Sequence, residues 1–468
     1  MTTKNRSILT GKRVRLHVLG CRSNLYEAEA LATSLSQMGA VACEKGPFAA
    51  AVLVSCVVTA EAERKCRQLV RRLKRQEPEA PVVVCGCWAQ FLEESVASDI
   101  GIDALVGNRR KHRVPAILEQ LIKEKTRKDL LVDKVDVSTS TLWDPLSLDC
   151  PKFHQRAFIK IQEGCNHRCT YCIIPEVRGA PVSRAPEDAL EEVGHVVSRG
   201  IREVVLTGIH LALYGKDTGE SLAMLVRAIE KIRGLDRLRF GSIEPFGLEE
   251  EVLEALAASE KFCPHLHLPL QSGDDRILRR MGRGCSSQEF LDLVKKIKKF
   301  LGDDLHLSTD VIVGFPGEDD AAFRRTFEVL ERAGVGKIHA FGFSPRKGTP
   351  AAEFRDRPSP EEVKDRMSEM LDFASRKHQE YASRWIGKRL SVLVEKSEKD
   401  VITGYTPPFI KAVCKGRVRA GDITEVEITG CSAGVLEGRV CYNAFSGTVR
   451  QNEGEGENQG SHGTTGFR

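Results

Sequence analysis

The sequence contains no apolar run that approaches the roughly 20 residues needed to cross a bilayer, which argues against a helical membrane protein. Its beginning, MTTKNRSILTGKRVRL, has some positive charge but lacks the apolar stretch of a secretory signal. The formal net charge is only +5, which by itself does not predict nucleic-acid binding. We therefore expect a cytoplasmic protein with no membrane partner.

A disulfide framework is not expected either, because thiols in the cytosol are kept reduced. The chain nevertheless contains 15 cysteines. In such a protein, many cysteines indicate metal-binding or catalytic thiols mixed with ordinary buried ones. The spacing of these cysteines is therefore the first feature to interpret.

The first block of the chain, residues 12–122, alternates between two kinds of pattern. Short apolar runs predict buried strands at 13–20, 50–55, 80–86 and 103–107. Helical spacing of apolar residues follows, as in NLYEAEALATSLSQMG (24–39) and near 60–75. Strands that alternate with helices predict an α/β fold with an open, mostly parallel, Rossmann-like sheet. The polar segment 123–152 is expected to be a linker.

The second block, residues 153–385, repeats this alternation. Six strand-like runs occur at 157–165, 202–209, 238–245, 265–273, 306–317 and 336–345. Amphipathic helices between them predict a partial (β/α)6 barrel of parallel strands.

The third block, residues 386–450, has a different character. Short strand-like runs such as RLSVLVE, FIKAVC and EVEIT are separated by turns that contain glycine. This pattern predicts a small β-barrel. The tail, 451–468, lacks apolar content and is expected to be disordered.

The stretch EGCNHRCTYCIIP (163–175) groups Cys165, Cys169 and Cys172. A structural zinc site needs four ligands, and the nearest further cysteines are far away in sequence. A redox C-x-x-C pair leaves Cys165 unexplained. A [4Fe–4S] cluster held by three thiolates keeps one iron open for another ligand. The loop also follows the first barrel strand, where barrel enzymes place their chemistry. The spacing favours a cluster, while redox and structural roles stay open.

Three other cysteines, Cys21, Cys56 and Cys87, each lie just beyond a predicted strand of the first block. Loops at the carboxyl ends of a parallel sheet converge in space. The three equivalent positions therefore suggest a second three-thiolate site. Cys85, inside its strand, is the best candidate for a false assignment, and the remaining cysteines show no cluster spacing.

The C-x3-C-x2-C motif, with Tyr171 before its last cysteine, resembles the signature of radical S-adenosylmethionine (SAM) enzymes. The whole arrangement resembles the methylthiotransferases, which add an N-terminal cluster domain and a C-terminal TRAM domain. The resemblance covers nearly the entire chain, through GCRSNLYEAEAL, CVVTAEAERKCRQLVRR, GCWAQ, GCNHRCTYCIIPEVRG, VVLTGIHLALYG, HLHLPLQSGDDRILRRM, TDVIVGFPGE and FSPRKGTPAA.

The resemblance implies two [4Fe–4S] clusters and SAM as cofactors. It implies a radical-generating cluster on Cys165, Cys169 and Cys172 and an auxiliary cluster that supplies or holds sulfur on Cys21, Cys56 and Cys87. By the same resemblance, one SAM is expected to methylate sulfur, and a second to give the radical that abstracts hydrogen from an unactivated C–H bond. The resemblance also implies contacts to SAM from Tyr171 of the cysteine motif and from residues at predicted strand ends, namely Thr207, Gly208, Glu244, Gln271 and Asp310. GFPGE (314–318) resembles the adenine-side loop.

An RNA substrate is suggested by basic residues of the third block. Lys411, Lys415, Arg417 and Arg419 lie in one strand–turn region, with Tyr405 and Phe409 nearby for stacking. The helix near 60–75 is also rich in lysine and arginine, although a solvated face is an equal interpretation.

Within the family, GCRSNLYEAEAL, LTGIHLALYG and GYTPPFIKA resemble the branch that acts on N6-threonylcarbamoyladenosine at tRNA position 37. This implies methylthiolation at C2 of that adenine, beside the anticodon, with flavodoxin or ferredoxin as electron donor. Isopentenyladenosine-37 and a ribosomal-protein aspartate are alternative substrates. A non-catalytic RNA-binding iron–sulfur protein is a further alternative, but the intact CNHRCTYC loop argues against it.

Overall fold

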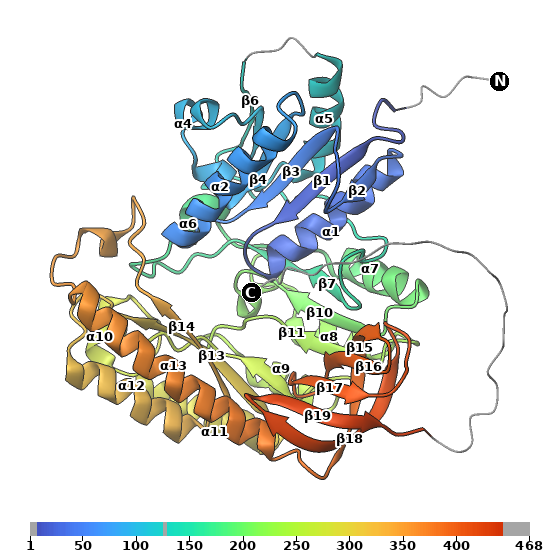
Figure 1. Ribbon diagram of the computed structural model, residues 1–468. Helices are drawn as coiled ribbons and strands as arrows, with labels where there is room; N and C mark the ends of the chain where they lie inside the picture. Colours follow the sequence, from blue (N-terminus) through green and yellow to red (C-terminus); the bar gives the residue numbers. More distant parts are fainter. Residues whose placement is uncertain (1–6, 125–128, 443–468) are drawn as a thin grey trace.

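The computed structural model describes residues 7–124 and 129–442 and contains an open parallel sheet, a partial barrel and a closed β-barrel (Figure 1). The open sheet lies in the upper half of the view, and its strand order is β2-β1-β3-β4-β5-β6. All neighbouring strands in it are parallel. The strands are β1 (Arg13–Val18), β2 (Val41–Cys43), β3 (Ala50–Ser55), β4 (Val82–Gly86), β5 (Ala104–Val106) and β6 (Leu131–Asp133).

Helices cover both faces of this sheet, so every residue of β3 and β4 is buried. One face packs against α1 (Arg22–Gln37) and α5 (Val114–Lys123). The other packs against α2 (Ala60–Gln76), α3 (Cys87–Phe91) and α4 (Glu94–Asp99). The predicted open α/β sheet is confirmed.

Two edge strands, β2 and β6, were not expected from the sequence. Each has only three residues, which is too short for a periodic pattern to be recognised. β6 falls within 123–152, so the interpretation of that whole segment as a linker is wrong. Leu146 and Leu148 of the same segment are buried in the main core.

The second block contains six parallel strands in the order β7-β10-β11-β12-β13-β14. Two three-stranded sheets are joined through the parallel bridges Leu238–Phe262 and Ser242–His267. The strands are β7 (Ala157–Lys160), β10 (Glu203–Thr207), β11 (Arg237–Phe240), β12 (His265–His267), β13 (His306–Val313) and β14 (Lys337–Gly342). A short hairpin, β8 (Gln162–Glu163) with β9 (Val182–Ser183), follows β7. The predicted six-stranded partial barrel is confirmed.

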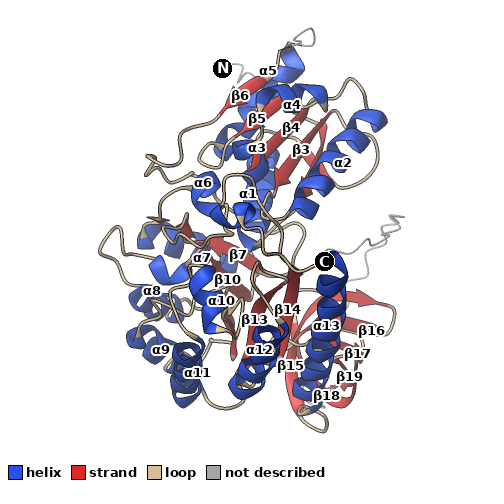
Figure 2. Cartoon of the chain, turned by 90° about the vertical axis from the view of Figure 1, so that its left-hand side faces the viewer, coloured by secondary structure: helices blue, strands red, loops and turns tan. Residues whose placement is uncertain are grey.

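Helices enclose this partial barrel on its outer side (Figure 2). Local sequence sets their starts: Ser286 forms a capping box with Glu289 before α11, and Ser359 forms one with Glu362 before α13. The helices of this block are α6 (Ile174–Arg178), α7 (Pro186–Ser198), α8 (Leu222–Glu230), α9 (Glu250–Ala257), α10 (Asp275–Arg280), α11 (Ser287–Leu301), α12 (Asp320–Ala333) and α13 (Pro360–Ser383). Of these, α6 packs against the first sheet and its helix α3 and not on the outer side of the barrel. Short 3-10 helices occur at Lys111–Arg113 (η1), Leu211–Leu213 (η2) and Pro350–Glu353 (η3).

The third block is a closed barrel in the order β15-β16-β17-β19-β18, as predicted. Its strands are β15 (Arg389–Glu398), β16 (Val401–Tyr405), β17 (Lys411–Lys415), β18 (Ile423–Ser432) and β19 (Val435–Val440). Tyr381 and Ala382, at the end of α13, complete its core. Residues 443–450 and the tail expected at 451–468 lie outside the described residues.

The small barrel docks at the amino-terminal ends of the partial-barrel strands. Arg237, the first residue of β11, donates to Tyr405 O at 3.0 Å. His306, the first residue of β13, lies 2.6 Å from Pro408 O through Nδ1. The small barrel therefore occupies the end of the strands opposite to the cysteine loop. Within the described part of the chain, no helix is long and apolar enough to cross a membrane.

Candidate active site

The loop that carries Cys165, Cys169 and Cys172 lies between β8 and α6, at the carboxyl-terminal mouth of the partial barrel. Its backbone is fixed at both ends. Cys165 N donates to Gly179 O at 2.9 Å, and Thr170 N donates to Met281 O at 2.9 Å. The loop is therefore held against two separate segments of the barrel mouth.

The three thiols of this loop are in desolvated surroundings. Burial raises the pKa of Cys165 to about 11 and that of Cys172 to about 12, and the neighbouring thiols add to the Cys172 shift. Cys169 is also buried, and Arg283 Nη1 lies 3.8 Å from its Sγ. Such thiols are neutral near pH 7 until a bound metal displaces their protons.

Cys21, Cys56 and Cys87 follow β1, β3 and β4, which are adjacent strands. Cys21 is the N-cap of α1, and Cys87 is the first residue of α3. Cys56 and Cys87 are buried, while Cys21 is exposed. Burial and the Cys87 and Cys21 thiols raise the pKa of Cys56 to about 12. The parallel sheet thus brings the three predicted residues to one edge.

Asn24 and Gly20 hold these loops close together. Asn24 Nδ2 donates to Ser55 O at 2.9 Å and to Leu19 O at 3.1 Å, so it ties the ends of β3 and β1. Gly20 has φ +130°, and a Cβ on it would lie 3.0 Å from Cys56 Cβ. This close approach requires glycine at position 20.

Arg178 connects the two cysteine groups. It ends α6, directly after the Cys172 loop, and is fully buried. Its Nε donates to Cys87 Sγ at 3.1 Å, and its Nη2 donates to Asn24 Oδ1 at 2.8 Å. Its Nη1 donates to Glu163 at 2.6 Å, beside the loop of Cys165. One side chain therefore contacts elements of both groups.

A buried ion network surrounds Arg178. Lys160 pairs with Glu27 at 2.9 Å and with Glu163 at 2.8 Å, and Lys111 pairs with Glu27 at 3.2 Å. Burial by itself would raise the pKa of Glu27, but Arg178, Lys111 and Lys160 hold it at about 2. Because a buried charge is costly without its partners, this network fixes the first sheet on the barrel mouth.

Across the described ranges of the chain, no three His, Cys, Asp or Glu side chains are already arranged as a metal site. The donor sets nevertheless fit iron–sulfur clusters, since thiolates are their usual protein ligands. A second observation supports a bound group at the mouth. His210 is 2% exposed, and both of its ring nitrogens are buried without a hydrogen-bond partner. Buried polar atoms are normally paired, so a ligand at this position accounts for them.

His210 was missed from the sequence, although the quoted stretch LTGIHLALYG contains it. Its ring lies 5.6 Å from His167 of the cysteine loop and 5.4 Å from Phe246, centroid to centroid. Burial lowers the pKa of His210 to about 4, so the ring is neutral at pH 7. Arg283 was also missed; it donates to Glu244 at 2.5 Å and lies near Cys169.

Of the residues predicted to contact SAM, Thr207 and Gly208 lie at a strand end, whereas Asp310 lies inside β13 and Tyr171 in the cysteine loop. Thr207 ends β10, and a Cβ on Gly208 would lie 2.9 Å from Gln162 Cβ. Gln271 has φ +74° and donates from its backbone N to Asp310 O at 2.8 Å. Asp310 itself pairs with His267 at 3.2 Å. Glu244 and Tyr171 lie nearer the cysteine loop: Glu244 pairs with Arg283, and the Tyr171 ring contacts the Phe315 ring at 6.3 Å.

The predicted RNA-binding residues Lys411, Lys415, Arg417 and Arg419 are exposed on the small barrel. Arg417 is paired with Asp400. The two aromatic residues suggested for stacking on RNA, Tyr405 and Phe409, contact other protein side chains. The Tyr405 and Phe409 rings stack on each other at 4.9 Å, and Arg156 lies over both. Both rings therefore form part of the docking surface of the small barrel, and their stacking on RNA stays a prediction.

Two known families match the sequence. The Radical SAM superfamily matches residues 159–330, and the Uncharacterized protein family UPF0004 matches residues 13–107. The threonylcarbamoyladenosine tRNA methylthiotransferase MtaB of Thermotoga maritima is 34% identical over 442 residues, which is 92% of this chain and 99% of that protein. The chain belongs to the radical SAM methylthiotransferase family.

Other methylthiotransferases are similarly related. The Bacillus subtilis protein of the same name is 34% identical over 89% of this chain and 93% of its own length. The tRNA-2-methylthio-N(6)-dimethylallyladenosine synthase of Pelotomaculum thermopropionicum is 33% identical over 92% of this chain and 98% of its own length. Membership in the family implies SAM and a [4Fe–4S] cluster, and the donor set of Cys165, Cys169 and Cys172 fits that cluster.

A solved structure supports the fold. The radical SAM methyltransferase TsrM from Kitasatospora setae superposes with a TM-score of 0.51, over 73% of this chain and 77% of that chain, at 14% sequence identity. At this identity the similarity bears on the fold alone. The methylthiotransferase thus has a radical SAM barrel with an open α/β sheet above it and a small β-barrel below (Figure 1).

Proposed function

We propose that this methylthiotransferase adds a methylthio group to C2 of N6-threonylcarbamoyladenosine at position 37 of tRNA, within the anticodon stem-loop. The observation that carries the substrate assignment is the end-to-end similarity to the Thermotoga maritima enzyme of that name. Residues 12–122 would hold the auxiliary cluster, 153–385 the radical cluster and SAM, and 386–450 part of the RNA. Flavodoxin or ferredoxin would deliver electrons.

The arrangement of the two cysteine groups supports a second [4Fe–4S] cluster on Cys21, Cys56 and Cys87. Arg178 contacts Cys87 of one group and Glu163, two residues before Cys165 of the other group. A C–H bond without an acidic proton gives a general base nothing to abstract. The radical cluster with SAM supplies the one-electron chemistry that such a bond requires.

The chain's own residues would bind and orient these groups. Arg283 spans Cys169 and Glu244, so it fixes the cysteine loop relative to the end of β11. Thr207, Gly208, Gln271 and Asp310 surround the position expected for SAM, with Tyr171 beside Cys172. The unpartnered nitrogens of His210 offer hydrogen bonds to a ligand held beside Cys165. Among the thiols of this loop, Cys169 is the one that is buried, which would limit the access of water to that side of the site.

The test is mass spectrometry of nucleosides from tRNA treated with the anaerobically reconstituted enzyme, SAM, reductant and sulfide. Two tRNAs are compared, one with threonylcarbamoyladenosine and one with isopentenyladenosine. A methylthio mass gain on the first alone is expected. A gain on the second alone would reassign the substrate to the dimethylallyladenosine branch. Release of 5′-deoxyadenosine without a gain on either tRNA would direct the search to a ribosomal-protein aspartate.

The matched control is the variant Cys165→Ala/Cys169→Ala/Cys172→Ala. It removes the radical-cluster ligands but leaves the first sheet and the small barrel intact. It should give neither methylthiolation nor 5′-deoxyadenosine while retaining tRNA binding. Retained SAM cleavage in this variant would overturn the assignment of these three cysteines.

A further inference from the structure

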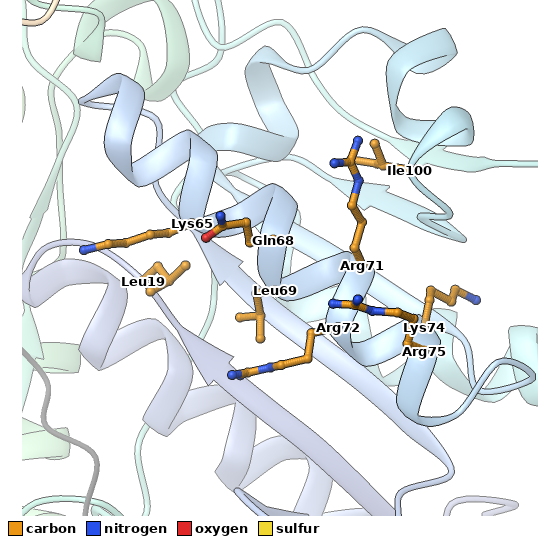
Figure 3. A pocket seen from close by; sticks show the side chains of 9 residues that line it. All are labelled: Leu19, Lys65, Gln68, Leu69, Arg71, Arg72, Lys74, Arg75 and Ile100. Carbon is orange, nitrogen blue, oxygen red and sulfur yellow. The ribbon is translucent and has the colours of Figure 1, made fainter.

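A basic groove runs along α2, on the side of the first sheet that faces away from α1 and α5 (Figure 3). Its volume is about 850 Å³. Buried Leu69 and Ile100, with Leu19, contribute its apolar parts, and the rest is polar or cationic. The polar lining consists of Lys65, Gln68, Arg71, Arg72, Lys74 and Arg75, and within the described residues no acidic side chain lines it.

Most of these cations are free to bind an anion. Lys74 is engaged by Asp103 at 2.7 Å, and Lys65 lies 3.7 Å from Glu61. In the described ranges of the chain, no carboxylate lies within ion-pair distance of Arg71, Arg72 or Arg75. All three arginines are exposed. By contrast, Arg64 and Arg67 on the same helix are paired with Glu61 and Glu63.

The groove begins at the edge of the sheet that carries the cysteines. Leu19 lies two residues before Cys21, and Thr59, the N-cap of α2, lies three residues after Cys56. Ala60 N also donates to Ser344 Oγ at 2.9 Å, so the start of α2 contacts the segment after β14 at the barrel mouth. The cations from Lys65 to Arg75 extend from there over about 15 Å of helix.

The predicted RNA-binding residues of the small barrel lie elsewhere. The small barrel docks at the amino-terminal ends of the strands, through Arg237 and His306. An RNA held only there would be anchored away from the cysteine mouth. The α2 groove adds cations in the first block. Lys65 lies nearest the cysteine edge, and Arg71, Arg72 and Arg75 follow on the last turns of α2, toward the amino-terminal ends of the first-sheet strands, where Lys74 pairs with Asp103.

The chemistry of the groove favours a phosphate backbone over a protein partner. Protein interfaces are centred on aromatic and apolar anchors, and lysine is depleted there. Large exposed hydrophobic side chains of the described residues, such as Phe341 and Leu371, lie outside the groove. No aromatic residue of the described ranges lines the groove, and its Leu69 and Ile100 are buried. Exposed arginines clustered in this way are the electrostatic signature of phosphate binding. About 15 Å of duplex presents roughly four phosphates on each strand.

We propose that the α2 groove binds the phosphate backbone of the tRNA and orients its anticodon arm over the barrel mouth, with Arg71, Arg72 and Arg75 as the phosphate contacts. This inference rests on the proposed function for the identity of the RNA. It adds a binding surface in the first block to the one expected on the small barrel.

The experiment compares the full chain with Arg71→Gln/Arg72→Gln/Arg75→Gln. The control, Arg202→Gln/Arg227→Gln/Arg324→Gln, removes the same charge from exposed arginines that pair with Asp236, Glu251 and Glu369. Binding of threonylcarbamoyladenosine-bearing tRNA is measured by fluorescence anisotropy between about 50 and 200 mM salt. The groove variant should bind about tenfold or more weakly at low salt and lose about 2 to 3 from its log–log salt slope.

The control should keep the wild-type slope. A groove variant with the wild-type slope would overturn the proposal. Turnover is also compared with dithionite and with an acidic flavodoxin as the reductant. If the groove variant keeps the wild-type salt slope and loses turnover only with flavodoxin, the groove binds the reductant and the proposal is overturned. Groove-dependent tRNA binding without any methylthio transfer would support the groove while contradicting the proposed function.

Discussion

Arg178 Nε donates to Cys87 Sγ at 3.1 Å, although the two residues are 91 positions apart in sequence. The arginine belongs to the helix that follows the radical-cluster loop, and the cysteine begins α3, directly after strand β4 of the first sheet. A guanidinium presents several donors in a fixed plane, so it holds Cys87, Asn24 and Glu163 together. The two cysteine groups are thereby kept in one relative position.

Arg178→Lys should shift the reduction potential of the proposed cluster on Cys21, Cys56 and Cys87 to a more negative value. Lysine retains the charge but cannot also supply the Nε hydrogen bond to Cys87. Hydrogen bonds to cluster sulfurs favour the reduced form. The potential is measured by EPR-monitored titration in the Cys165→Ala/Cys169→Ala/Cys172→Ala background, where one cluster remains.

Arg184→Lys is the matched control for this measurement. Arg184 is also buried and paired with a carboxylate, Glu192. No contact with a cysteine is found for it in the described part of the chain. It should leave the potential unchanged. Equal reduction potentials in wild type and Arg178→Lys would contradict an effect of the Arg178 hydrogen bond on the cluster. Arg178 would then act only by holding the surrounding residues in place.

The iron content should divide between the two cysteine groups. Replacing Cys21, Cys56 and Cys87 with alanine should remove about half of the reconstituted iron, roughly four atoms per chain, and replacing Cys165, Cys169 and Cys172 should remove the other half. The buried strand residue Cys85 is the control, and Cys85→Ala should keep all the iron. Loss of all iron from either triple variant would mean that the two sites do not form independently.

Gly164→Ala should disrupt the cysteine loop. Gly164 has φ +74°, and a Cβ there would overlap the carbonyl oxygens of Gly179 and Ala180. Because Cys165 N is bonded to Gly179 O, this clash displaces the first ligand. We expect loss of the radical-cluster iron and of SAM cleavage, read by iron analysis and 5′-deoxyadenosine release.

Gly200→Ala separates this clash from backbone strain. Gly200 also has a positive φ, +95°, but nothing described lies within 4 Å of an added Cβ. It should cost about 1 kcal/mol in unfolding free energy and retain both clusters. If the two variants behave alike, the contact with residues 179–180 has no special importance.

Glu318→Gln should remove a pH dependence of stability. Burial raises the pKa of Glu318 to about 7, despite the Gly314 N–H and Arg366. The folded chain therefore holds this proton more tightly than the unfolded chain. The stabilisation is complete below about pH 4.5 and is lost as the pH rises through about 7, by up to about 3 kcal/mol at 1.36 kcal/mol per pKa unit.

Denaturant unfolding between pH 4.5 and 8 measures this effect. Wild type should lose stability relative to Glu318→Gln over that range, since glutamine is neutral throughout and still accepts the Gly314 N–H. Glu328→Gln, at an exposed position of α12, is the control and should follow wild type. Parallel curves for Glu318→Gln and wild type would show that Glu318 titrates alike in the folded and unfolded chain.

The fold was largely predictable because central strands such as β3, β4 and β10 are fully buried. Runs such as AAVLVS and APVVVCG indicate parallel strands covered on both faces. The short edge strands β2 and β6 were missed, since three residues give no period. The sequence suggested Tyr405 and Phe409 for stacking on RNA but could not show that they lie at the docking surface of the small barrel.

By itself, the sequence determined the two groups of three cysteines and their placement after strands. Cys165, Cys169 and Cys172 follow from spacing within one loop, and Cys21, Cys56 and Cys87 from the position of each just beyond a strand-like run; both signals are local in the chain. Only the tertiary structure decided that Arg178 joins them, that His210 is left with unpartnered buried nitrogens, and that the small barrel docks away from the mouth. These relationships depend on burial and on contacts between residues distant in sequence, which no local pattern encodes.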